Sequence, residues 1–225
     1  MPARTIITWP SAILAQTSEF ISLIDSDVVD LANDLVDTMN VSFGAGLAAT
    51  QVGDLKSMVV IREGYAGLEL PPDPVVKTAV VLVNPAVKFV GDDKFWWNEA
   101  CLSVPNYQGK VRRHKKIDLT YTDLSGKEHV VTLEDESAGV VQHEVDHLNG
   151  KLFLDRLPSD RRRAVLMGLR RRINAEKKSK DKFLKMMSIE EESQSTDALK
   201  IGRPRPKRNS KKKGKTYGKN KRRSR

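Results

Sequence analysis

Apolar positions along the chain recur at two spacings, one typical of helices and one typical of strands. We predict that residues 10–40 are helical, because Val28, Leu31, Leu35 and Met39 recur at three- and four-residue intervals. Short apolar runs predict strands; they read "SMVVI" (57–61), "AVVLVNP" (79–85), "KIDLTYTD" (116–123) and "HVVTLE" (129–134). "DLSG", between the last two runs, predicts a hairpin turn.

Two further helices are predicted in the second half of the chain. "ESAGVVQHEVDHLNGKLF" (136–153) is expected to be helical and to end at Asn149 and Gly150, which are typical of a helix C-terminus. Ser159 is a plausible N-cap for a helix over 159–187, whose apolar residues fall on one stripe. Residues 62–78, rich in Pro and Gly, are expected to form a surface loop. The predicted class is α+β, with antiparallel or mixed sheets around a central helix, plus a C-terminal helix and a disordered basic tail.

Charge divides the chain into two unlike parts. Residues 1–156 carry 14 Lys and Arg against 22 Asp and Glu, a net charge of −8. Residues 157–225 carry 25 against 7, a net charge of +18. We therefore expect a globular domain over 1–158, a basic helix over 159–187 and a disordered Lys/Arg-rich tail over 188–225. Such asymmetry suggests a polyanion as partner of the basic part.

Composition restricts the setting in which the protein works. The chain has no apolar run as long as the roughly 18 residues of a membrane span, and its N-terminus lacks the features of a secretory signal. Its one cysteine, Cys101, leaves no internal disulfide framework. A reducing, cytoplasmic location is the natural expectation.

The stretch "QHEVDHLNG" (142–150) carries candidate metal chemistry. His143 and His147 stand four residues apart, so a helix places them on the same face, one turn apart. Two imidazoles so placed can share a metal ion, and Glu144 can reach a water bound to that ion. The alternative is a helix with two half-exposed histidines and a charged neighbour.

A catalytic metal site of this kind needs a third protein ligand and an open position. No histidine follows His147, and the later glutamates lie in the basic helix and the segment after it. Upstream, "NEACLSVPNYQG" offers Cys101, which would bind as a thiolate beside a dication. A lone cysteine is also commonly a small buried apolar residue, and the spacing does not decide between the two interpretations.

Three segments together resemble the motifs of one family. "GAGLAATQVG" (44–53), "EACLSVP" (99–105) and "QHEVDHLNG" (142–150) resemble, in order and spacing, the three motifs of peptide deformylases. The opening "TIITWPSAILAQTSEFI" is similar to the N-terminal strand and loop of that family. The resemblance covers residues 4–157, nearly the whole predicted globular domain.

The resemblance implies a role for each matching residue. Cys101, His143 and His147 would hold the metal, and Glu144 would be the general acid and base. The side-chain amide of Gln51 and the backbone N–H of Leu102 would stabilise the developing oxyanion. The substrate would be bound by residues from two segments and the predicted central helix: Gly44, Ala45, Gly46, Leu47, Trp97 and Val140.

The implied activity is removal of the N-formyl group from the N-terminal formyl-methionine of newly synthesised proteins. The metal would lower the pKa of a water, and the resulting hydroxide would attack the formyl carbon, with Glu144 transferring the proton. The resemblance implies one divalent metal per chain, Fe²⁺ in the native enzyme, for which Zn²⁺, Ni²⁺ or Co²⁺ can substitute.

The sequence departs from the family pattern near the expected pocket. Ala100 stands where the family more often has glycine, and Gln108 where it often has a basic residue. Glu136, Ser137 and Gly139 replace larger apolar residues, which predicts a roomier or more polar methionine pocket. Trp97 could restore the lost apolar surface or could be simple core packing. These departures leave the ligands, Glu144 and Gln51 intact.

The basic extension is expected to contact the ribosome and its RNA. Family members often end in a helix that docks some bacterial enzymes on the ribosome, and residues 200–225 hold 14 Lys and Arg and no acid. The residues expected to bind are Arg161, Arg162, Arg170, Arg171, Lys211, Lys212, Lys213, Arg222 and Arg223. A solubilising tail or a nuclear address are the alternatives.

Two other functions compete with a deformylase. A zinc peptidase would use the same pair of histidines but lacks a downstream ligand and leaves Cys101 and Gln51 unexplained. An RNA-binding protein on a decayed enzyme fold would not need the intact ligands. We expect a monomer of bacterial origin, or one encoded by a bacteriophage and acting in a bacterial host, with formylated nascent peptides as substrate and no membrane partner.

Overall fold

The structure is a computed structural model that describes residues 3–201, with side chains for residues 3–185 except Ala66. It contains three helices: α1 (Ser26–Val41), α2 (Asp135–Leu148) and α3 (Ser159–Ile201). Its strands are β1 (Gly46–Ala48), β2 (Met58–Ile61), β3 (Val80–Phe89), β4 (Lys94–Ala100), β5 (Gln108–His114), β6 (Lys116–Thr122) and β7 (Glu128–Glu134). Four short 3-10 turns complete it: η1 (Ala12–Ala15), η2 (Ala49–Val52), η3 (Tyr65–Gly67) and η4 (Phe153–Asp155).

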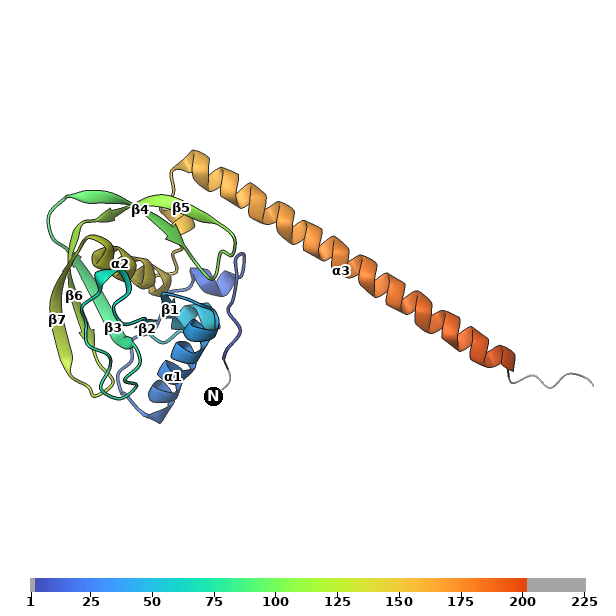
Figure 1. The fold of residues 1–225 in the computed structure, drawn as a ribbon, viewed down its shortest axis with the longest axis horizontal. Helices are drawn as coiled ribbons and strands as arrows, with labels where there is room; N and C mark the ends of the chain where they lie inside the picture. The colour runs from blue at the N-terminus through green and yellow to red at the C-terminus, as the bar shows by residue number, and fades with distance from the viewer. Residues whose placement is uncertain (1–2, 202–225) are drawn as a thin grey trace, which may run out of the picture. The chain divides into compact units, whose positions relative to one another are not determined.

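The strands form one five-stranded sheet in the order β1-β2-β3-β6-β7 and a separate β4–β5 hairpin. All of these ladders are antiparallel. In Figure 1, α2 lies between the β4–β5 hairpin and the curved sheet. The predicted α+β class, with a helix at the centre of β-structure, is confirmed.

The sheet has a helix on each face because β2 and the first four residues of β3 are apolar at every position. In β2, Val59 and Ile61 pack in the cluster that contains α2, whereas Met58 and Val60 pack in the cluster that contains α1. Successive side chains of a strand point to opposite faces, so β2 and β3 read as continuous apolar runs when both faces are covered. The sheet therefore lies between α1 on one face and α2 on the other.

The helix predicted within residues 10–40 is correct only in its second half. Helix α1 begins at Ser26, where the side chain of Asp25 caps it by accepting a bond from the N–H of Val28. The preceding residues satisfy their backbone groups elsewhere: the N–H of Ser18 donates to the carbonyl of Leu148. The N-terminal segment has no strand within the described residues either, only isolated bridges.

The four predicted strands are present, and the predicted turn at 123–126 joins β6 to β7. Strands β1, β4 and β5 were not predicted. Strands β4 and β5 carry charged residues at both inward-facing and outward-facing positions, and β1 is a three-residue strand that begins with glycine. None of the three therefore gives a clear apolar alternation. Helix α2 ends as expected, with Asn149 as its C-cap and Gly150 in the left-handed region.

Helix α3 begins at Ser159 as predicted but continues to Ile201 instead of ending at residue 187. The segment 188–201, which was expected to be disordered, contains three Glu and one each of Ala, Gln, Leu and Lys, residues that favour helices. A globular unit ends at Arg170 and a second unit begins at Arg171. The first turns of α3 therefore belong to the globular unit, where Leu169 packs with Phe153 and Val111. No helix within residues 3–201 is long and apolar enough to cross a membrane.

Gly150 provides a test of the connection after α2. Its φ is +65°, and a Cβ there would lie 2.5 Å from the carbonyl oxygen of Ala15. Gly150→Ala should lower the free energy of unfolding by about 3 kcal/mol, because a left-handed alanine costs about 1–2 kcal/mol and the backbone clash adds to it.

Gly91→Ala is the matched control, because Gly91 has a φ of +71° and open space around its Cβ position. It should lose only the conformational part, about 1 kcal/mol. Urea unfolding of both variants gives the comparison, and equal losses would contradict the close approach to Ala15.

Candidate metal centre and active site

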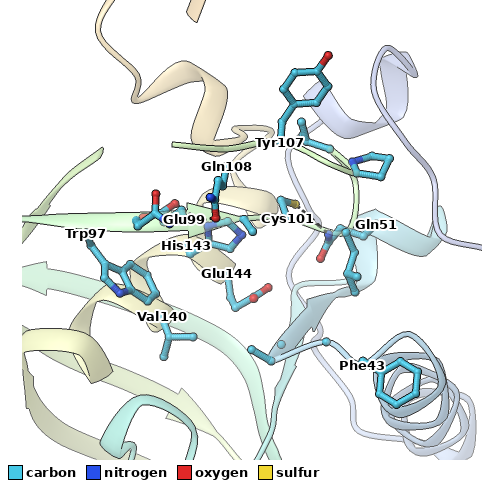
Figure 2. A pocket seen from close by; sticks show the side chains of 18 of the residues that line it. Phe43, Gln51, Trp97, Glu99, Cys101, Tyr107, Gln108, Val140, His143 and Glu144 are labelled. Carbon is cyan, nitrogen blue, oxygen red and sulfur yellow. Dashed lines mark hydrogen bonds and ion pairs between the residues drawn. The ribbon is translucent and has the colours of Figure 1, made fainter. Parts of the chain in front are cut away.

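Three side chains suited to bind a metal converge where the end of β4 meets the second half of α2. Cys101 follows β4 directly, while His143 and His147 occupy adjacent turns of α2. The Cys101 Sγ lies 3.3 Å from the His147 Nε2, and the ligand atoms of all three residues lie within 4.8 Å of one another. Figure 2 shows Cys101 and His143 at the same cavity. The third member of the group comes from upstream of the two histidines, from the chain's only cysteine.

The donor set fits a single metal ion. One sulfur and two imidazole nitrogens are ligands that zinc and iron sites use, with a fourth position left for water or substrate. The Nδ1 of His143 lies 2.7 Å from Glu99 Oε2, so the carboxylate accepts from Nδ1 and the Nε2 remains for a metal. Burial alone would raise the pKa of the Cys101 thiol, but the neighbouring His147 and His143 outweigh it and lower the pKa to about 5. A thiolate is the form that binds a metal.

A chain of ion pairs, running from Glu99 through Arg113 and Asp146 to Arg156, holds His143 in place. Glu99 accepts two bonds from Arg113, at 2.6 and 2.9 Å. Arg113 also donates to Asp146, 2.5 Å away, and Asp146 in turn accepts two bonds from Arg156. Burial would raise the pKa of the Glu99 carboxyl, but Arg113 and His143 together hold it below its usual value. Each charge has an opposite partner, which is the condition for keeping ionised groups in a protein interior.

Glu144 is a buried acid of α2 in which one oxygen has no such partner. Among the described residues its Oε2 has no hydrogen-bond partner, as is also true of Asp34 Oδ1 on α1, and burial raises the pKa of the Glu144 carboxyl against the opposing charges of His143 and His147. A Cβ at Gly46 would lie 2.5 Å from Glu144 Oε1. Only glycine at position 46 leaves room for the carboxylate where it stands. An unpaired buried oxygen beside a metal-ligand group is typical of a residue that handles protons.

The backbone N–H of Ala48 orients the side chain of Gln51. Its Oε1 accepts from the N–H of Ala48 at 2.9 Å, which turns the Nε2 toward Ser103 Oγ at 3.1 Å and Cys101 Sγ at 3.5 Å. The side chain is buried and points to the same cavity as Cys101 (Figure 2). Its amide is therefore a fixed donor next to the candidate metal position.

These groups meet at a cavity of about 720 Å³. Of the residues predicted for the site, the cavity is lined by Gly44, Ala45, Gly46, Gln51, Trp97, Cys101, Leu102, Val140, His143 and Glu144. His147 is not among the lining residues, and neither is Leu47. Leu47 is fully buried in the cluster that packs α1 on the sheet, so any contact it makes with a ligand would come from its backbone in β1.

The family comparison agrees with this geometry, since the polypeptide deformylase family model matches residues 3–163. The chain belongs to the peptide deformylase family. A peptide deformylase of Agrobacterium fabrum is 37% identical over 166 residues, 74% of this chain and 94% of that protein. One of Bartonella henselae is 36% identical over 172 residues, 76% of this chain and 94% of that protein. The crystal structure of the Ehrlichia chaffeensis peptide deformylase superposes with a TM-score of 0.67 at 29% identity, covering 78% of this chain and 99% of that one.

The structure explains one of the departures from the deformylase pattern, the glycine at position 139. A Cβ at Gly139 would lie 2.8 Å from the Trp97 ring, so the small residue on α2 makes room for the large one on β4. Trp97 also lines the cavity beside Val140 (Figure 2), which supports the idea that it replaces lost apolar surface. Ser137 does not enter the cavity lining; its hydroxyl donates to the carbonyl of Glu134 in the first turn of α2.

The sequence reasoning missed the residues that support the metal ligands. Glu99 lies within one family motif and Asp146 within another, but each was overlooked because its neighbour carries the recognisable chemistry. Arg113 lies in a strand that was not predicted, so nothing in the local pattern marked it as buried. Phe43, Tyr65, Asn106 and Tyr107 also line the cavity and were not singled out.

Glu99→Gln tests the support of His143. Removing the negative charge while keeping an amide of the same shape should weaken metal binding about 10- to 100-fold, because an outer-shell carboxylate raises the basicity of the histidine ligand. Competition with a chelator for Zn²⁺ or Co²⁺ measures the change.

The control for this experiment is Glu134→Gln, which removes a surface ion pair with Lys116 at the far end of β7. It should leave metal affinity unchanged. The chain of ion pairs would have no role in the metal site if both variants bound the ion as tightly as the parent protein.

Proposed function

We propose that this chain is a metal-dependent deformylase that removes the formyl group from the N-terminal formyl-methionine of newly made proteins. One observation supports this above all: two members of the Cys/His/His group, Cys101 and His143, line one cavity together with a buried carboxylate and a fixed amide donor. The bacterial relatives named peptide deformylase support the same activity. Fe²⁺ is proposed as the native ion, with Zn²⁺, Ni²⁺ or Co²⁺ as substitutes.

A divalent ion held by Cys101, His143 and His147 would supply a water of lowered pKa and polarise the formyl oxygen. The work of this chain's other residues is to move the proton and hold the charge. Glu144 would take the proton of the attacking water and return it to the departing amine. Its raised pKa, which burial causes, suits a group that must both accept and donate a proton near neutral pH.

The developing oxyanion would be held by two donors that do not need to move. Gln51 Nε2 is locked by the bond between its Oε1 and the Ala48 N–H, and the backbone N–H of Leu102 follows the ligand cysteine directly. Leu102 lines the same cavity. Each such preorganised donor is typically worth about 10²–10³ in rate.

The substrate would bind along β1. This strand is at the edge of the five-stranded sheet, so one side of its backbone has no strand partner, and Gly44, Ala45 and Gly46 line the cavity. An extended peptide adding to a sheet edge would fix the formyl group, and the apolar surface of Trp97 and Val140 would take the methionine side chain. Glycine at position 46 also keeps the backbone close enough for Glu144 to reach the formyl group.

Glu144→Gln is expected to lower formate release from formyl-Met-Ala-Ser by at least about 10²-fold, because no other buried acid replaces it as proton carrier. Protein purified anaerobically and assayed alongside its metal content gives both readouts. Metal content should stay near that of the parent protein, since Glu144 is not among the three grouped ligands.

Glu128→Gln, on the exposed start of β7, serves as the control and should keep full activity. A Glu144→Gln protein that releases formate at the parent rate would overturn the mechanism. A parent protein that carries metal but releases no formate would overturn the proposed activity itself.

The partner proposed for the basic extension is the ribosome. Arg161, Arg162 and Arg170 are exposed on the part of α3 that belongs to the globular unit, and Arg162 pairs with Asp155. Arg171 is exposed at the start of the second unit. The other predicted contacts, Lys211, Lys212, Lys213, Arg222 and Arg223, lie outside the described residues.

Sedimentation with ribosomes tests this contact. The full chain should co-sediment at low salt and be released steeply as salt rises, because each neutralised phosphate releases a counterion. A variant ending at Ile201 should bind at least about 10-fold more weakly while keeping formate release, since it loses 13 of the 14 cations of residues 200–225. Equal binding by both proteins would contradict the role of the tail.

A further inference from the structure

The β4–β5 hairpin has a solvent-facing side, of which only the end formed by Asn98, Ala100 and Gln108 lines the deformylase cavity. Side chains alternate along both strands, so one side packs toward the core and the other is exposed. The cross-strand register places Trp96 opposite Arg112 and Asn98 opposite Lys110. We define the hairpin outer face by its eight positions: Lys94, Trp96, Asn98, Ala100, Gln108, Lys110, Arg112 and His114.

The hairpin outer face is basic, although the domain that carries it is acidic. None of its positions is an acid, and Lys94, Lys110 and Arg112 have no carboxylate within ion-pair distance among the described residues. Lys115 and Lys116, which follow directly along the chain, are both paired with acids at the start of α2 and the end of β7. Three unpaired cations on a domain of net charge −8 form a local site for anions.

An exposed aromatic ring lies in the middle of these cations. Trp96 is 58% exposed, and the Arg112 guanidinium lies 5.9 Å from the centroid of its ring. The pairing of an open aromatic ring with unpaired cations is the arrangement by which proteins stack a nucleobase and hold its phosphate.

A second cavity, of about 660 Å³, adjoins Trp96. Its walls are apolar, from Trp96, Leu157, Pro158 and Val165, and it is also lined by Lys110 and Arg161. It shares only Gln108 with the lining of the deformylase cavity. Apolar walls with cations beside them suit a flat aromatic group that carries a negative charge.

The other end of the hairpin outer face opens on a third cavity, of about 610 Å³. Lys94, Arg112 and Lys151 line it, together with His114, whose buried Nδ1 has no hydrogen-bond partner. Cations therefore continue from the Trp96 cavity across the hairpin to this one, along a path that a chain of phosphates could follow.

We propose that the hairpin outer face and the Trp96 cavity bind unpaired nucleotides of RNA. Stacking needs a base that is not already stacked in a duplex, so the partner is single-stranded RNA or an RNA loop. An acidic protein would satisfy the cations but would leave Trp96 and the apolar cavity without a complementary group. The site is built from residues of the globular unit alone, so it depends neither on the basic tail nor on the deformylase activity.

The test measures binding of the full chain to a fluorescein-labelled, single-stranded oligouridylate. Trp96→Ala should bind about 5- to 100-fold more weakly, the range expected for loss of one base–aromatic stack, and Trp96→Phe should retain most of the affinity. Phe20→Ala removes another exposed aromatic side chain, which is 77% exposed outside the hairpin, and should not change binding. Circular dichroism verifies that each variant is folded.

Charge variants test the phosphate contacts separately. Lys110→Gln combined with Arg112→Gln should reduce the salt slope of binding by about 1.4, or roughly 0.7 for each lost phosphate contact. The control pair Lys56→Gln and Lys116→Gln removes two lysines that are already paired with acids, and it should leave the slope nearly unchanged.

Cross-linking separates this site from the tail. RNA containing 5-iodouridine should cross-link to the peptide that contains Trp96, and mass spectrometry identifies that peptide. The proposal would be overturned by cross-links only beyond residue 201, or by Trp96→Ala binding as tightly as Phe20→Ala. It would also be overturned if Trp96→Ala weakened binding to a duplex of the same length as much as it weakened binding to the single strand, because stacking on Trp96 would then have no part.

Discussion

The constraint on which this structure depends is the burial of a helix that carries ionisable groups. His143, Glu144, Asp146 and His147 are all at most 7% exposed, although they occupy two consecutive turns of α2. Burying a charge without a partner costs several kcal/mol, so such a helix is stable only if the surrounding elements bring opposite charges to it. Much of the domain does this: β4 supplies Glu99, β5 supplies Arg113, and the segment after α2 supplies Arg156. The β4–β5 hairpin therefore covers α2 with charges matched to those of the helix.

Because the other buried charges of α2 are paired, the one unpaired carboxylate oxygen on this helix is informative. Where every other buried charge on α2 has a partner, Glu144 Oε2 has none, and Gly46 leaves open the space in front of Glu144. A protein selected only for stability would pair or replace this carboxyl. The proposed mechanism sets two opposite requirements, metal ligands that are held firmly and a proton carrier that is left unpaired, and adjacent positions on one helix fit both of them.

The sequence identified the candidate metal ligands and the candidate proton carrier better than the residues that position them. His143, Glu144 and His147 follow from helical spacing, and the strands with long apolar runs, β2, β3, β6 and β7, follow from composition. The β4–β5 hairpin was missed because its inner positions include Glu99 and Arg113, whose burial depends on each other and on Asp146, 33 residues from Arg113. Local patterns record polarity but not the distant partner that makes a polar side chain suitable for the interior. The helix predicted from residue 10 failed for a related reason, since residues before Asp25 bond to distant segments of the chain.

The two sides of the hairpin divide its charges by function. On the inner side, Arg113 is neutralised by two carboxylates, so its charge orients His143 and creates no field outside the domain. On the outer side, Lys110 and Arg112 are unpaired, so their field reaches solvent and favours approach of an anion to this face of an otherwise acidic domain. Gln108 lines both the deformylase cavity and the Trp96 cavity, and Asn98 donates to it across the hairpin. A polyanion bound on the outer side would thus lie next to the deformylase cavity.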